Sequence, residues 1–159
     1  MAECCCSVPS TADASRPKVC GGCRTAGKPV DSPTVKALLT ETALSRFDPA
    51  EYRFCPDAHC DVVYFAEGVR AFRTADVRIP VWQKESAGHR TICYCFAENE
   101  GNIAEEVNQT GHSLAVDRVR EHIAAGRCAC EVRNPKGACC LGDVIAAVER
   151  MRKRGVPRP

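Results

Sequence analysis

The chain has 159 residues, and its 22 Lys and Arg against 20 Asp and Glu leave a formal net charge of +2. This length fits one average domain or two small ones. The balanced charge gives no reason to expect nucleic acid or an anionic membrane as a partner. The sequence contains no run of 18 apolar residues, so it predicts no membrane-spanning helix.

Residues 1–17 are small and polar with no periodic apolar pattern, so we expect a flexible tail, which carries Cys4, Cys5 and Cys6. The tail lacks the basic stretch and apolar core of a signal peptide, which favours the cytoplasm, where thiols stay reduced. The chain has 13 cysteines, and an odd number excludes a complete disulfide framework within one chain. Thiolate–metal bonding is therefore the favoured interpretation.

Residues 18–85 are predicted to form a small zinc-binding unit of β-hairpin and helix. Ser32-Pro33 is typical of a helix start, with Ser32 as the N-cap. Short strands are predicted at 52–54 and 61–65. The alternation over 77–82 predicts a further strand, which Pro80 would place at a sheet edge.

Residues 85–91 are predicted to be a linker, and residues 92–155 a second, mainly helical unit. Because the first unit contains strands and the second is mainly helical, the expected fold class is α+β. Helices are predicted from about 98 to 109 and from a cap at Ser113 to Gly126. The last helix is the clearest, because it combines an apolar stripe with a terminating glycine. The stripe and the glycine are Leu141, Val144, Ile145, Val148, Met151 and Gly155.

Two cysteine pairs in the first unit indicate a closed zinc site. Cys20-Gly-Gly-Cys23 has the form of a zinc knuckle, and Cys55-Pro-Asp-Ala-His-Cys60 lies between two predicted strands. Two such pairs form the tetrahedral Cys4 arrangement of structural zinc. His59 is either a replacement ligand or an exposed neighbour. A thioredoxin-like role for the knuckle is disfavoured because no convincing strand precedes it.

The second unit contains a tighter cysteine pattern, which favours a 2Fe–2S cluster. Cys93-Tyr-Cys95 is too close for an ordinary mononuclear pair but suits two thiolates on one iron. The other ligands would come from Cys128-Ala-Cys130 and Cys139-Cys140, which flank the turn sequence 134–137. Cys140 would open the last helix, where free N–H groups favour the charge of a reduced cluster. The spacing alone leaves a second zinc open.

A resemblance supports this interpretation. The segments Thr91-Ile-Cys-Tyr-Cys-Phe96 and 126–143 (GRCACEVRNPKGACCLGD) resemble the iron–sulfur domain of CopZ-type metallochaperones. That domain is itself similar to bacterioferritin-associated ferredoxin. The knuckle and the segment 52–65 are similar to the zinc-binding portion of the same family. The resemblance covers about residues 18–152.

The resemblance implies particular ligands. The cluster would be held by Cys93, Cys95, Cys130 and Cys140, and zinc by Cys20, Cys23, Cys55 and Cys60. Cys128 and Cys139 are then spare, and they are either inert buried thiols, replacement ligands or a transient soft-metal site.

The copper chaperones of this type continue into a heavy-metal-associated domain with its own Cys-x-x-Cys, which we do not find in this sequence. Cys4, Cys5 and Cys6 would suit Cu(I), Hg(II) or As(III), since soft ions prefer thiolates. The alternative is that this patch has no selected role. The question is therefore whether the three thiols of the tail replace the Cys-x-x-Cys ligands that usually serve in copper handover.

The function expected from these features is that of a metallochaperone-like protein. It would bind or reduce copper or another thiophilic ion and pass it to a protein partner, either a chaperone or a transporter. The alternative is a 2Fe–2S electron-transfer module that serves a redox partner. We find no Ser-His-Asp arrangement, phosphate loop or acid–base pair, which disfavours a substrate-specific enzyme.

Overall fold

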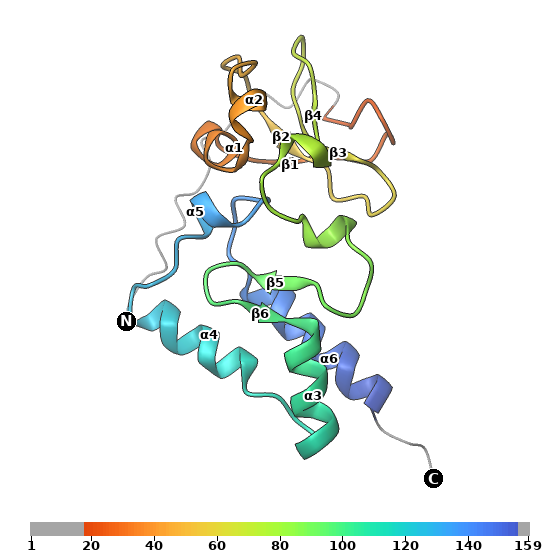
Figure 1. The fold of residues 1–159 in the computed structure, drawn as a ribbon, viewed down its shortest axis with the longest axis vertical. Coiled ribbons are helices and arrows are strands. Elements are labelled where there is room, and N and C mark those ends of the chain that lie inside the picture. Colours follow the sequence, from red (N-terminus) through yellow and green to blue (C-terminus); the bar gives the residue numbers. More distant parts are fainter. Residues whose placement is uncertain (1–17, 156–159) are drawn as a thin grey trace. The chain divides into compact units, whose positions relative to one another are not determined.

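The structure is a computed structural model and describes residues 18–155 (Figure 1). Helices and antiparallel strands are mixed, which makes the fold α+β. The described residues divide into two compact units. The first unit takes in the chain up to Glu85 together with Glu131–Ala138, and the second takes in Ser86–Cys130 and the chain from Cys139 onward. Within residues 18–155, no helix is long and apolar enough to cross a bilayer.

The first unit is built on a four-stranded antiparallel sheet with the strand order β1-β2-β3-β4. β3 is buried along its whole length, and its Tyr64 pairs with Phe54 of β2. Short helices complete the unit (Figure 1). The elements are β1 (Lys28–Pro29), α1 (Ser32–Leu38), α2 (Glu41–Leu44), β2 (Arg53–Phe54), β3 (Val62–Phe65), β4 (Phe72–Arg73) and the 3₁₀ turns η1 (Thr74–Asp76) and η2 (Trp82–Lys84).

The core of the first unit lies against this sheet and is rich in aromatic rings. Tyr52 stacks on Phe47, with ring centroids 5.4 Å apart, and also contacts Phe72. Aromatic side chains bury a large apolar area each, so a few of them stabilise a small unit. The buried core residues are Val30, Val35, Leu38, Leu39, Ala43, Tyr52, Phe54, Val63, Tyr64, Phe72, Val77 and Val81.

Two sequence predictions for this unit are wrong in detail. Asp31, not Ser32, occupies the N-cap of α1, and Ser32 is already helical. The predicted strand 77–82 does not form. Val77 makes only an isolated bridge to Leu39, and Val81 precedes η2. Both valines are buried, so the alternating pattern reflects burial of an extended segment without a hydrogen-bonded ladder.

The second unit combines a β-hairpin with helices. α3 and α4 both pack on α6, and each of the three helices has a fully buried residue, namely Ile103, Val119 and Val144. The hairpin was not predicted from the sequence. The elements are β5 (Thr91–Cys93), β6 (Glu98–Asn99), α3 (Glu100–Thr110), α4 (Ala115–Ala124), α5 (Cys130–Arg133) and α6 (Leu141–Gly155).

The ends of these helices follow the local sequence. α6 runs from Leu141 to Gly155, as the apolar stripe predicts. The Asn99 side chain caps α3 by accepting from the amide of Asn102 at 2.9 Å. α4 begins at Ala115, two residues after the expected cap Ser113, whose hydroxyl still accepts from the Ala115 amide.

Two arginine–glutamate networks stabilise the second unit. The Glu100 side chain is 1% exposed and accepts from the amide of Gly88 and from the guanidinium groups of Arg90 and Arg150. Burial opposes ionisation of Glu100, but these donors outweigh it and lower its pKa to about 2. Arg118 pairs with both Glu98 and Glu106. These ion pairs fix the start of α3 and the end of the hairpin that carries Cys93.

Candidate metal centres

The first cysteine group is held by two tight loops. In the 20–25 knuckle, Cys20 donates its amide to the carbonyl of Thr25 at 2.9 Å, and the Gly22 amide points to the Cys20 sulfur at 3.4 Å. The other loop joins β2 to β3 and runs from Cys55 to Cys60. A Cβ on Gly22 would lie 3.2 Å from the Cys60 sulfur. The two loops therefore approach so closely that glycine suits position 22.

Four sulfur atoms converge between these loops. The Sγ atoms of Cys20 and Cys60 are 3.8 Å apart, and those of Cys23 and Cys55 are 3.5 Å apart. All four lie within 4.8 Å of one another. A tetrahedral zinc ion with Zn–S bonds of about 2.3 Å needs sulfurs about 3.8 Å apart. The donor set and its dimensions thus fit a zinc ion.

The protonation of these thiols differs with their surroundings. Hydrogen bonding with Thr25 lowers the pKa of the Cys23 thiol to about 7. Burial raises the pKa values of Cys55 and Cys60. Burial therefore favours the neutral thiol form of Cys55 and Cys60. A bound zinc ion would displace these protons, because the ligand of the metal is the thiolate.

A ring of polar contacts holds the 55–60 loop. Asp57 accepts from the His59 amide at 2.8 Å and from the Thr25 hydroxyl at 3.2 Å, which ties the loop to the knuckle. The Lys84 ammonium donates to the carbonyls of Asp57 and Cys60 at 2.9 and 2.8 Å. The sequence analysis did not find Lys84, which lies 24 residues beyond Cys60. The His59 ring is exposed and is not among the four converging groups.

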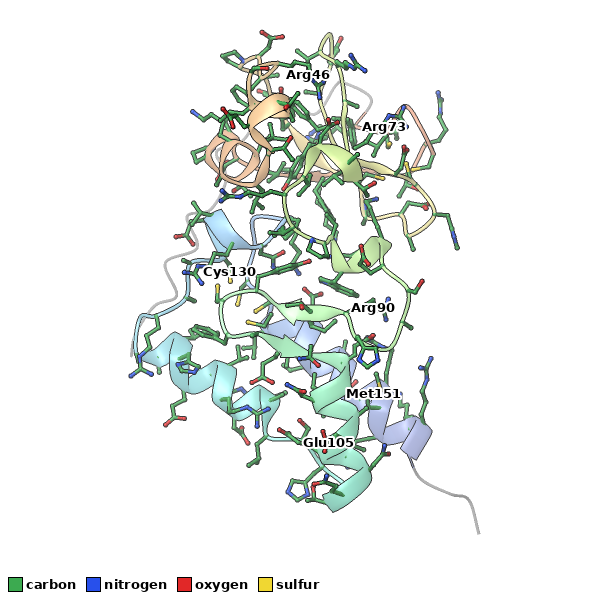
Figure 2. The ribbon with its side chains drawn as sticks, in the orientation of Figure 1. Arg46, Arg73, Arg90, Glu105, Cys130 and Met151 are labelled. Carbon is green, nitrogen blue, oxygen red and sulfur yellow. The ribbon has the colours of Figure 1, made fainter. Side chains whose placement is uncertain are left out.

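The second cysteine group is assembled from three separate elements. Cys93 ends β5 and Cys95 follows in the hairpin turn, Cys130 begins α5, and Cys140 immediately precedes α6 (Figure 2 labels Cys130). The Sγ atoms of Cys140 and Cys93 are 2.8 Å apart, and those of Cys95 and Cys130 are 3.7 Å apart. The Cys140 side chain is also hydrogen-bonded to the Cys130 side chain. The contacts therefore link all four sulfurs, in the order 95, 130, 140, 93.

Each close sulfur pair in this group joins a hairpin cysteine to a cysteine at a helix start. The expectation that Cys93 and Cys95 bind one iron stays a prediction. In the hairpin turn, Ala97 adopts a left-handed conformation (φ 56°).

Hydrogen bonds to the sulfurs set the protonation of this group. The amide of Ala129 donates to the Cys95 sulfur at 3.3 Å. Hydrogen bonding from Cys140 lowers the pKa of Cys93. Hydrogen bonding with Cys130 raises the pKa of both Cys95 and Cys140, because those bonds hold the neutral form. Within the described residues, only the first group brings all its sulfurs within 4.8 Å of one another.

The remaining cysteines flank or lie outside these groups. Cys128 and Cys139 are partly buried and each is one or two residues from a cysteine of the second group. The ten cysteines from Cys20 to Cys140 are all thiols without a disulfide. Cys4, Cys5 and Cys6 lie outside the described residues.

The fold and the four-sulfur group define a protein with a zinc-binding domain. The family model zf_CopZ, described as a zinc binding domain, matches residues 17–78. No curated protein sequence matches the chain. Among solved structures, the N-terminal domain of CopZ from Archaeoglobus fulgidus is 32% identical with a TM-score of 0.66.

That match covers 80% of this chain and 95% of the CopZ domain, so it extends over both units. The chain therefore belongs to the family of CopZ N-terminal domains. Residues 17–78 are its zinc-binding portion. Metal ions are accordingly ligands of this protein.

Proposed function

We propose that the chain is a metallochaperone-like protein that carries two metal centres and handles a thiophilic ion, copper being the first candidate. Zinc is held by Cys20, Cys23, Cys55 and Cys60. A 2Fe–2S cluster is held by the second group of sulfurs. Zinc has a structural role, because its site is closed by four protein ligands and tied to the core of a small unit.

The observation that supports the cluster is the second convergence of four cysteines, Cys93, Cys95, Cys130 and Cys140. Soft thiolates, N–H donors to sulfur and burial of three of the four residues are what an iron–sulfur centre requires. A 2Fe–2S cluster, when bound, supplies one-electron transfer. The chain's own residues exclude water from the site and orient the thiolates.

The handling of a third ion rests on the thiols that neither centre uses. Cys128 and Cys139 flank the second group, and Cys4, Cys5 and Cys6 are three adjacent thiols in the sequence. Cu(I) prefers such ligands. The protein would bind the ion through these thiols and pass it to a protein partner.

The first test is metal analysis with electron paramagnetic resonance on protein purified without oxygen. We expect one zinc and two iron ions per chain, with a 2Fe–2S signal after reduction. Zinc at both centres and no iron would contradict the cluster assignment.

The second test is titration of Cu(I) into the zinc- and iron-loaded protein. We expect at least one further equivalent to bind, and binding should weaken when Cys4, Cys5 and Cys6 are all replaced by Ser. If no copper binds to a protein that carries both other metals, the chaperone role is wrong. The electron-transfer module would then be the better description of the chain.

A further inference from the structure

Residues 131–138, here called the 131–138 segment, belong to the first unit although both flanking cysteines belong to the second. Two buried side chains of the first unit bind its backbone. The Thr34 hydroxyl of α1 donates to the carbonyl of Glu131, and the Tyr64 hydroxyl of β3 donates to the carbonyl of Pro135 at 2.8 Å. Thr34 is 1% exposed and Tyr64 is fully buried. A buried hydroxyl that finds a carbonyl 71 residues away is a specific anchor.

The packing around this segment is equally close. Gly137 has a φ of +65°, and a Cβ there would lie 3.0 Å from the Thr34 hydroxyl oxygen and 3.1 Å from a Val30 methyl. Asn134 is 1% exposed, and its amide group donates to the carbonyl of Ala138 at 2.7 Å. The segment therefore forms a closed turn that packs closely against Thr34 of α1 and against Val30, which follows β1.

The ends of the segment lead directly to cysteines of the second group. Glu131 follows Cys130, and Ala138 is two residues before Cys140. Because the first unit holds Glu131 and Pro135, it also restricts where the chain can place those two sulfurs. An unanchored loop of this length would sample many distances between the sulfurs of Cys130 and Cys140. Bringing these sulfurs together would then cost conformational entropy at the moment of metal binding.

We propose that Thr34 and Tyr64 are positioning residues through which the folded zinc-binding unit organises half of the ligands of the second centre. This inference rests on the proposed function for the identity of that centre as a 2Fe–2S cluster. It predicts that loss of zinc releases the 131–138 segment and weakens the hold on iron. Zinc would then control the redox centre without contacting it.

The first arm of the test needs no iron. Hydrogen–deuterium exchange is measured on zinc-loaded protein for Tyr64→Phe and for Tyr52→Phe. Tyr52 is a matched control, because its buried hydroxyl also donates to a backbone carbonyl of the first unit, that of Asp48 at 2.9 Å. Tyr64→Phe should speed exchange in peptides covering 131–138 about fivefold, as expected for one lost hydrogen bond, while Tyr52→Phe leaves them unchanged.

In the wild type, a zinc chelator should raise exchange in the 131–138 segment together with α1, while α3 serves as the internal reference. Equal exchange in the segment for both tyrosine variants would overturn the anchoring. No response to zinc removal would overturn the dependence of the segment on zinc. Thr34→Val, which keeps the shape of the side chain, should repeat the effect of Tyr64→Phe at the Glu131 end.

The second arm uses iron-loaded protein with equal zinc content. The half-life of the visible iron–sulfur absorbance in the presence of an iron chelator should fall about fivefold for Tyr64→Phe relative to Tyr52→Phe. Equal half-lives would overturn the positioning role. If the wild type holds no iron at all, the cluster assignment fails, while the exchange measurements still decide whether the zinc-binding unit holds the segment.

Discussion

The two cysteine groups are built from different numbers of elements. The first comes from two short loops, Cys20 to Cys23 and Cys55 to Cys60, and its close sulfur pairs join one loop to the other. The second draws one hairpin and two helix starts together, so its sulfurs meet only when three elements have been placed. A metal that joins two loops can organise a small unit, whereas a site built from three elements depends on the fold around it. We therefore expect zinc to act as a cause of folding and the second centre to be its consequence.

The largest expected effect is the loss of zinc. Cys20→Ser should abolish zinc binding and unfold the first unit, because structural zinc contributes on the order of 10 kcal/mol, comparable to the whole stability of a small domain. Zinc content and thermal melting by circular dichroism measure this. Cys128→Ser is the matched control and should leave both unchanged. A Cys20→Ser protein that melts like the wild type would remove the contrast between the two groups.

The next effect concerns the second group. Cys95→Ser or Cys140→Ser should abolish the visible iron–sulfur absorbance, because each removes one of the converging sulfurs. Zinc content should stay at one per chain. Cys139→Ser should keep the absorbance, and the reverse result would move the ligand from position 140 to 139.

Part of this contrast could be predicted from the sequence. The spacing of Cys20 and Cys23 and the apolar stripe of α6 are local patterns. They depend only on residues close in the sequence, so they can be recognised without the tertiary structure. The strand expected at 77–82 was wrong, since Val77 and Val81 are buried without a ladder. The hydrogen bonds from Tyr64 to Pro135 and from Lys84 to the 55–60 loop could not be predicted from local sequence patterns, because they join residues far apart in the chain.

A third prediction concerns the stability of the second unit itself. Glu100 has a folded pKa of about 2 against an ordinary value of 4.5, so its carboxylate stabilises the fold by about 3 kcal/mol at neutral pH. Because the folded pKa is the lower one, this contribution is complete above pH 4.5 and is lost as the pH falls toward 2. Glu100→Gln should therefore cost about 3 kcal/mol at pH 7 and progressively less below pH 4.5.

Urea unfolding followed through the second unit measures this difference across pH. Glu105→Gln is the control, since Glu105 is exposed on the same helix and its loss should matter little at any pH. A penalty for Glu100→Gln that stays constant from pH 7 to pH 3 would contradict the ionised state of Glu100.

The smallest effect is expected around the zinc site. Lys84→Met should leave zinc bound but speed its release to a competing chelator about tenfold, because two charge-assisted hydrogen bonds to the 55–60 loop are lost. Lys28→Met is the control, an exposed lysine of the same unit. Equal release rates for the two variants would show that the loop holds its shape without the ammonium group.

The 131–138 segment also bears on how such a protein can change over evolution. Domains that are continuous stretches of chain can be exchanged, duplicated or lost by a cut at one linker. Here a cut after Glu85 would separate Thr34 and Tyr64 from the backbone carbonyls that they bind. The part of the chain up to Glu85 cannot be inherited alone without leaving the hydroxyls of Thr34 and Tyr64 without these carbonyl partners. We therefore expect this part to be retained together with the 131–138 segment.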